Sequence, residues 1–136
     1  MRNVSLAVCL SVLAACTGQA TSRRASVVSL TPHVHSGEKD VVSFYYSVEP
    51  NCEINGYPVA AVSKAPNHGS LSDEKGEDYP DFGKDNLRYG CNRTLVQGIH
   101  ISYQSEPNFH GKDSFVIEER FPDSSHLTFS YTVEVL

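Results

Sequence analysis

Two groups of side chains in this sequence have the chemistry to hold a metal ion. His33 and His35 stand at alternate positions, so both imidazoles would lie on one face of a strand and could meet a zinc ion. The segment from Ser72 to Asp85 is rich in carboxylates, the ligands that calcium prefers. However, no third zinc ligand follows at a diagnostic spacing, and the acidic segment lacks the spacing of an EF-hand loop. We therefore expect no metal and no other cofactor, and only weak, salt-sensitive cation binding at a candidate cation loop of Asp73, Glu74, Glu77, Asp78 and Asp81.

The remaining polar residues do not form a recognisable catalytic set. No nucleophile-elbow sequence, phosphate-binding loop or Cys–His pair is present. Glu118 and Glu119 are adjacent, so on a strand they would face opposite sides, which does not suit the paired carboxylates of a glycosidase. The net charge of −5 and the lack of a basic cluster argue against nucleic-acid binding. We expect a protein without enzymatic activity.

The N-terminus has the pattern of an export signal. Arg2 precedes an apolar run over residues 4–15 that is too short to span a bilayer. The run ends in Leu13-Ala14-Ala15-Cys16, which resembles the lipobox of bacterial lipoproteins. This resemblance implies a signal peptide over residues 1–15, cleavage before Cys16 and a diacylglyceryl group on its thiol. The alternative is an ordinary signal peptide that happens to contain a cysteine.

Cysteine usage fits this interpretation. Of the four cysteines, Cys9 would leave with the signal peptide and Cys16 would carry the lipid, so Cys52 and Cys91 remain. An exported chain meets an oxidising compartment, and we predict a disulfide between these two residues rather than two free buried thiols. Closing a loop of that length should stabilise the fold by about 4 kcal/mol.

The mature chain shows the alternation of β-strands. Residues 16–26 are small and polar and are predicted to be a flexible, lipid-anchored tether. Val42, Phe44, Tyr46 and Val48 are predicted to share one strand face, and the residues from Leu127 to Val135 alternate in the same way. Further strands are expected over residues 27–33, 58–64, 86–91, 99–103 and 115–121. About seven short strands separated by Gly, Pro and Asn turns favour an antiparallel sandwich over residues 27–136.

The segment Tyr103 to Phe115 is predicted to be the structural corner of this sandwich. Gly111 should adopt a positive φ that a Cβ would block, and Asp113 should accept hydrogen bonds from turn amides. Phe109 and Phe115 can enter the core on either side of the turn, and Tyr103 closes the preceding strand. We interpret these residues as a fold brace rather than as a binding site.

The spacing of this corner resembles the Tyr-x-Pro-x-x-x-Phe-x-Gly-x-Asp-Ser-Phe signature of bacterial cadherin-like and Ig-like surface domains. Upstream, Pro66-Asn67-His68-Gly69-Ser70-Leu71 resembles the Pro-x-His-Gly turn of the same domains, which adds Pro66 and Gly69 to the structural turn residues. The match departs at Ser105, where the family has proline, and at residues 121–125, where it often has Asp-x-x-Gly. The calcium-ligand clusters of true cadherins are absent. The resemblance therefore implies an Ig-like or cadherin-like sandwich rather than calcium binding.

Together these features lead to one expected function and two alternatives. We expect a lipid-anchored binding or structural module of the cell envelope, on the outer membrane and facing the periplasm or the cell surface. Its partners would be the membrane, through the anchor, and an unknown protein or envelope glycan, with Tyr57, Tyr79 and Tyr89 as loop aromatics suited to contact. The alternatives are a periplasmic inhibitor lipoprotein that binds a basic hydrolase such as a lysozyme, and a small metal-dependent enzyme.

Overall fold

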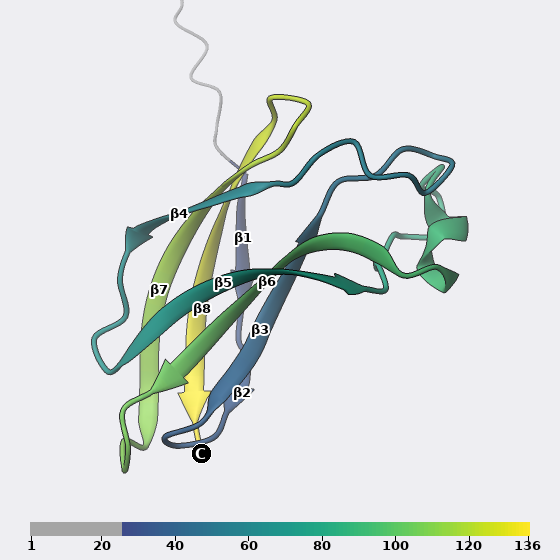
Figure 1. The fold of residues 1–136 in the computed structure, drawn as a ribbon. Helices are drawn as coiled ribbons and strands as arrows, with labels where there is room; N and C mark the ends of the chain where they lie inside the picture. Colours follow the sequence, from purple (N-terminus) through teal and green to yellow (C-terminus); the bar gives the residue numbers. More distant parts are fainter. Residues whose placement is uncertain (1–25) are drawn as a thin grey trace, which may run out of the picture.

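The computed structural model describes residues 26–136, which form eight β-strands and one short 3₁₀ helix (Figure 1). The predicted signal peptide, the lipobox Cys16 and most of the tether lie outside these residues. No helix in the described part of the chain is long and apolar enough to cross a membrane. The elements are β1 (Val27–Leu30), β2 (His33–Val34), β3 (Lys39–Tyr46), β4 (Val59–Lys64), β5 (Gly69–Asp78), η1 (Tyr89–Arg93), β6 (Val96–Ser105), β7 (Gly111–Arg120) and β8 (His126–Val135).

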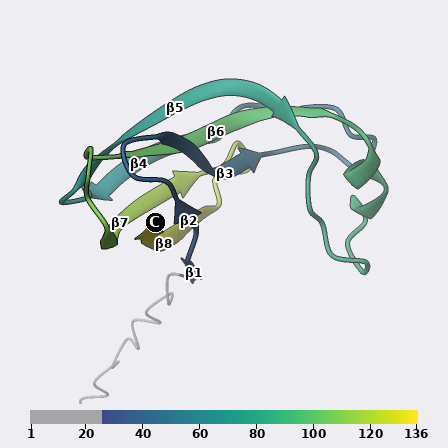
Figure 2. The same cartoon turned by 90° about the horizontal axis from the view of Figure 1, so that it is seen from below.

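The strands form two sheets that face each other, which confirms the predicted all-β sandwich (Figure 2). One sheet has the order β1-β8-β7-β4, with β2 also paired to β8, and the other has the order β3-β6-β5. The strand count is eight rather than about seven. The pairing is not entirely antiparallel, because β1 and β2 both run parallel to β8. The strand expected over residues 27–33 is split at Pro32, which has no N–H to donate to a sheet ladder.

The connections alternate between two ends of the sandwich, and this decides which segments can meet. The β3–β4, β5–β6 and β7–β8 connections lie at one end, together with the start of β1; we call this the loop end (Figure 1). The β2–β3, β4–β5 and β6–β7 connections and the C-terminus lie at the other, which we call the corner end (Figure 1).

Aromatic side chains fill the centre of the core. Phe115 stacks on Tyr131 with ring centroids 4.6 Å apart and on Tyr103 at 5.8 Å, and all three are fully buried. The Tyr131 hydroxyl shares a hydrogen bond with the Tyr45 hydroxyl on the facing sheet. Burial raises the pKa of both phenols, so each remains a neutral hydrogen-bonding group. The aromatic stack therefore joins the two sheets through apolar contact and a satisfied polar bond.

The carboxylate of Asp113 connects the corner segment, Tyr103 to Phe115, to the upstream turn, Pro66 to Leu71. One carboxylate oxygen accepts the N–H of His68 at 2.8 Å and the Tyr103 hydroxyl at 3.0 Å, and the other accepts the N–H of Asn67 at 2.9 Å and of Ser114 at 2.8 Å. Burial alone would raise the pKa of Asp113, but these donors outweigh it and hold the pKa below its ordinary value. The predicted turn brace thus acts mainly on the β4–β5 turn rather than on its own turn.

Two glycines of the motifs are required for different reasons. Gly111 has a φ of +129°, which confirms the predicted positive φ. A Cβ on Gly69 would lie 2.6 Å from the Tyr103 ring and from the Gln104 carbonyl oxygen. Gly69 therefore lets the ring of Tyr103 pack directly on the backbone of β5. Phe109 covers the same turn by stacking on the imidazole of His68 at 4.1 Å.

The prediction of a loop from Ser72 to Asp85 was wrong for the first half of this segment, which holds four of the five candidate cation ligands. Residues 69–78 form β5, which pairs with β6 along its whole length and forms the free edge of the three-stranded sheet. The sequence did not reveal this strand because its residues are charged on both faces. Charged side chains are a common feature of edge strands, where they discourage pairing with other chains. Only Asp81 of the five acidic residues lies in the loop that follows.

Two other local predictions were also wrong. Residues 86–91 do not form a strand, because the chain turns into η1 there. In β3, the core residue is Tyr45, whereas Phe44 packs beside His100, which faces away from the core. The register with β6 shifts between Val41 and Ser43. A β-bulge of this kind adds one residue, so simple alternation counted across it assigns the wrong face.

Glu119 is the one buried side chain in the described residues whose carboxylate has no hydrogen-bond partner. It is fully buried between the sheets, on the same inward-facing row of β7 as Asp113, Phe115 and Ile117. Burial, and then the charge of Asp73, raises the pKa of Glu119 to about 7. Glu118, its neighbour, is exposed on the outer face, so the two glutamates do not form a pair.

Removal of the Asp113 carboxylate should strongly destabilise the fold. We expect Asp113→Ala to lower the free energy of unfolding at pH 7 by about 2–4 kcal/mol, since four donors, one of them fully buried, lose a charged acceptor. Tyr103→Phe, which removes one of these donors, should cost about 1 kcal/mol. Urea unfolding measures both, with Asp85→Ala on the exposed loop as the control. An Asp113→Ala protein that unfolds at the wild-type urea concentration would contradict the brace.

Glu119 should make the protein less stable as the pH rises through neutrality. Its pKa of about 7 in the folded state exceeds the ordinary value of 4.5, so the folded state holds the proton more tightly than the unfolded state. Its ionisation should therefore cost about 3 kcal/mol of stability between pH 4.5 and pH 8. Glu119→Gln should abolish this loss, whereas Glu118→Gln should retain it. If the free energy of unfolding changed with pH in the same way for wild type and Glu119→Gln, Glu119 would not titrate in this range.

Candidate binding site at the loop end

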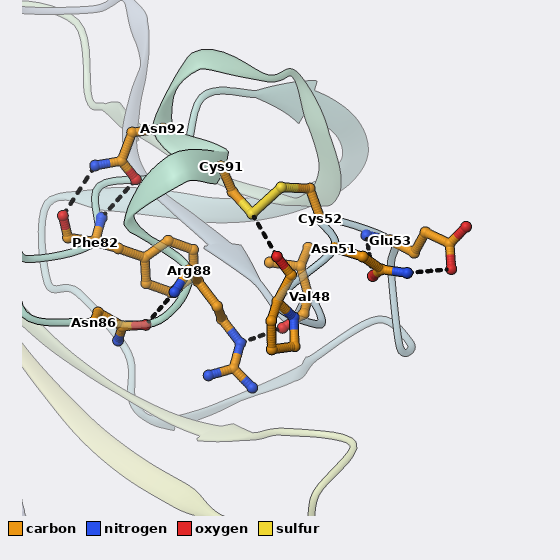
Figure 3. The surroundings of a disulfide bond; sticks show 10 residues. Val48, Asn51, Cys52, Glu53, Phe82, Asn86, Arg88, Cys91 and Asn92 are labelled. Atoms are coloured by element: carbon orange, nitrogen blue, oxygen red, sulfur yellow. Dashed lines mark hydrogen bonds between the residues drawn. A yellow bond between two sulfur atoms is a disulfide. The ribbon is translucent and has the colours of Figure 1, made fainter.

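The disulfide predicted between Cys52 and Cys91 is present and organises the loop end (Figure 3). It joins the β3–β4 connection to η1 within the β5–β6 connection, with a Cα–Cα distance of 5.4 Å. Cys91 is fully buried, and the turn over residues 49–52 closes with the Cys52 N–H donating to the Glu49 carbonyl. The two longest connections are thus held together where the aromatic core does not extend.

Polar side chains fix the long β5–β6 connection onto the end of β3. Asn92 uses both amide atoms on the backbone of Phe82, each at 2.9 Å (Figure 3). Phe82 in turn packs edge-on against Tyr46 with centroids 5.3 Å apart, and the Tyr46 hydroxyl accepts the N–H of Asp81. The guanidinium of Arg88 donates from Nε to the Val48 carbonyl (Figure 3). This segment therefore has a defined conformation, although η1 is its only regular element.

A hollow of about 550 Å³ lies between these fixed loops and the β7–β8 turn. A concave site with a few convergent polar groups and aromatic side chains is a common form of binding site. Loops of different connections contribute to it, as is usual when a rigid sandwich carries a binding function. We call it the loop-end hollow; its lining residues are Tyr46, Ser47, Val48, Glu49, Asn55, Phe82, Asn86, Arg88, Phe121, Asp123, Ser125 and Leu127.

The loop-end hollow combines one guanidinium with two carboxylates. The Ser125 hydroxyl and N–H hydrogen-bond to Asp123 and hold the pKa of its carboxyl below the ordinary value, and Arg88 adds to this effect. Glu49 accepts the side-chain amide of Asn55 at 3.0 Å. Arg88 uses Nε on the protein backbone, which leaves its two terminal nitrogens as donors. The arrangement suits a ligand with hydroxyl, amide or carboxylate groups.

A second hollow of about 450 Å³ lies on the outer face of the five-stranded sheet. It runs across β4, β7 and β8, and Val59, Ala61 and Thr128 line it beside Glu118, Arg120 and His126. Most of these side chains are well exposed and belong to regular strands. We regard the loop-end hollow as the better candidate because it is larger and is formed by loops that are fixed in place.

The three loop tyrosines occupy different environments. Tyr79 and Tyr89 are exposed and lie on the β5–β6 connection, where Leu87 is also largely exposed. Tyr57 is half-buried and has the ammonium group of Lys75 4.1 Å from the centre of its ring. Tyr79, Leu87 and Tyr89 are thus exposed on the same connection that contributes Phe82, Asn86 and Arg88 to the hollow, whereas Tyr57 packs at the entry to β4.

The carboxylates of the candidate cation loop do not come together. Successive residues of β5 face opposite sides of the sheet, so Asp73 and Glu77 lie on one face and Glu74 and Asp78 on the other. Asp78 pairs with His100 at 3.4 Å instead. His33 and His35 also have separate partners, since His33 contacts Glu134 at 3.5 Å.

Sequence reasoning missed the residues that line the loop-end hollow. Arg88, Glu49 and Asp123 are ordinary loop residues in the sequence, with no motif around them. The available signal was the disulfide itself, because the segments next to Cys52 and Cys91 had to become neighbours. The contribution of the β7–β8 turn could not be found this way, since it depends on the packing of the two sheets.

No protein-family model matches the chain, and no curated protein matches it. The solution structure of amebosin is similar to 82% of this chain, over 98% of its own length, at 14% sequence identity and a TM-score of 0.40.

Proposed function

We propose that the protein is a lipid-anchored extracytoplasmic β-sandwich that acts as a non-enzymatic binding module of the cell envelope. The observation that carries this proposal is the loop-end hollow, in which the Cys52–Cys91 disulfide holds two long connections around polar and aromatic side chains. The lipid anchor is supported by the lipobox at Cys16. The disulfide is consistent with an exported protein, because such bonds persist in oxidising compartments.

The position of the hollow restricts where its ligand would lie. The described chain begins at the loop end, where the Ser26 carbonyl accepts the N–H of Thr128 beside β8. The ten residues from Thr17 to Ser26 can span at most about 35 Å. An anchor at Cys16 would therefore keep the hollow close to the membrane surface. A protein or glycan of the envelope near that surface is the ligand class that this placement favours.

The charge of β5 favours a second candidate function, inhibition of a basic hydrolase. Asp73, Glu74, Glu77 and Asp78 are all exposed along the free edge of the three-stranded sheet. None of them forms an ion pair with a lysine or arginine in the part of the chain that the structure describes. A cationic partner such as a lysozyme would be attracted to this edge, and the attraction would weaken at high salt.

Binding experiments with site variants test the main proposal. Purified protein should bind either isolated peptidoglycan or an envelope protein captured by crosslinking. We expect Arg88→Met and Glu49→Gln each to weaken that binding by about tenfold or more, as loss of a charged hydrogen-bonding partner implies. Lys112→Met, at the corner end, is the matched control and should bind as wild type does. Reduction of the disulfide should also weaken binding, because the two connections are then no longer joined.

The outcomes separate the two candidate functions. Binding that Arg88→Met and Lys112→Met reduce equally would exclude the loop-end hollow as the site. Saturable binding of lysozyme that is lost at high salt, and lost when Glu74 and Asp78 are changed to Gln and Asn, would support the inhibitor function instead. Absence of both kinds of binding would contradict both candidate functions.

The lipid anchor has its own test. We expect Cys16→Ala to release the protein from the membrane fraction or to block signal-peptide processing, since the diacyl group provides about 0.8 kcal/mol of membrane affinity per buried CH₂. Fractionation with metabolic fatty-acid labelling measures both effects. Cys9→Ala is the matched control and should be labelled normally. Normal labelling and fractionation of Cys16→Ala would refute the anchor.

A further inference from the structure

At the corner end, the turn between β2 and β3 brings together three side chains that commonly bind metal ions. One ligand atom from each of His35, Glu38 and Asp40 can be chosen so that all three lie within 4.8 Å of one another. The His35 Nδ1 is 3.4 Å from the Asp40 carboxylate and 4.0 Å from the Glu38 carboxylate. The sequence analysis paired His35 with His33 and did not reveal this group, because Glu38 and Asp40 come close to His35 only through the turn between β2 and β3.

The backbone of this turn is held by several hydrogen bonds. Asp40 accepts the N–H of His35 at 2.8 Å, and the N–H of Glu38 donates to the His35 carbonyl at 3.2 Å. Gly37 has a φ of +77° and donates its N–H to the hydroxyl of Ser105 at 2.7 Å. The same hydroxyl donates to the His35 carbonyl at 3.2 Å. The three candidate ligands thus project from a turn whose backbone is fixed before any ion arrives, which lowers the entropic cost of binding.

The charge of the group favours a cation. In residues 26–136, neither Glu38 nor Asp40 forms an ion pair with a lysine or arginine, so a single imidazole lies beside two carboxylates. All three side chains reach solvent, with Asp40 the least exposed, which leaves room for water molecules to complete a coordination shell. A mixed set of one nitrogen and two oxygen ligands suits divalent first-row transition ions better than calcium or magnesium, which take oxygen ligands alone.

We propose that His35, Glu38 and Asp40 form a binding site for a divalent transition-metal ion such as Zn²⁺. The ion would bind one imidazole nitrogen and one oxygen from each carboxylate, with water in the remaining positions. This site is separate from the loop-end hollow and does not depend on the function proposed for it. Bound metal would join the end of β2 to the start of β3 and so stabilise the corner end.

Calorimetric titration of the full chain, purified in detergent, with ZnCl₂ tests the site. We expect saturable binding of one ion per chain that calcium and magnesium do not compete for. His35→Ala and Asp40→Asn should each weaken Zn²⁺ binding by at least about tenfold, as loss of one direct ligand implies. Asp40→Asn keeps an oxygen that can accept the His35 N–H, so its melting temperature without metal should match that of wild type.

His33→Ala is the matched control. His33 is equally exposed and also lies beside a carboxylate, Glu134, but it has no third ligand. Its removal should leave Zn²⁺ affinity within about twofold of wild type, whereas a general attraction to surface histidines would be weakened equally by His33→Ala and His35→Ala. That equality would overturn the proposal. Equal competition by calcium, or titration without saturation at one ion per chain, would overturn it as well.

Discussion

The buried carboxylate of Asp113 is the interaction on which the corner end depends. Asp113 belongs to β7 in the five-stranded sheet, and Tyr103, which donates to it, belongs to β6 in the three-stranded sheet. The β4–β5 turn, whose Asn67 and His68 amides also donate to Asp113, is one of the segments that cross from one sheet to the other. One side chain therefore links the two sheets and holds the crossover between β4 and β5. A buried charge is tolerated here because donors surround it.

The segments at the loop end are held in place by different chemistry. Two of the three connections there are long and polar, and they lie beyond the aromatic core. The Cys52–Cys91 disulfide joins these two, and the side chains of Asn92 and Arg88 hold their backbone in place. Because the bond is covalent, the side chains around it need not contribute to a packed core. The corner end is thus held by buried hydrogen bonds and the loop end by a covalent bond.

Asp113 and Glu119 show how strongly local donors decide the state of a buried carboxylate. Both lie on the inward-facing row of β7, and both are buried. Asp113 has four donors and a pKa below its ordinary value, whereas Glu119 has none and has its pKa raised to about 7. Asp73 on the facing sheet increases the cost of ionising Glu119. The interior between the sheets therefore holds one carboxylate at the corner end that ionises readily and, farther along the same strand, one carboxylic acid that is mostly neutral only below about pH 7.

Short-range pattern in the sequence was enough to predict several features of the fold. Alternation identified β6, β7 and β8, cysteine counting identified the disulfide, and the glycine and aspartate of the corner predicted a positive φ and a hydrogen-bonding brace. The strand predictions and the positive φ succeeded because each depends on residues close in sequence. The disulfide was predicted because Cys52 and Cys91 are the two cysteines outside the predicted signal peptide and lipobox. The brace was predicted at the right residue, but its main partners lie in the β4–β5 turn. The sequence analysis did not predict the charged edge strand β5 or the bulge in β3, since strand pairing rather than apolar alternation defines both features.

Which residues meet across the molecule could be known only from the packed sheets. Asp113 accepts hydrogen bonds from residues 45 and 46 positions away in the sequence. The loop-end hollow is lined by residues of three connections that no local motif links. The isolation of Glu119 likewise depends on the facing sheet, because an inward position on a strand says nothing about which donors lie opposite. The physical reason is common to all three: hydrogen bonding and desolvation depend on neighbours in space, and the packing of the two sheets sets those neighbours.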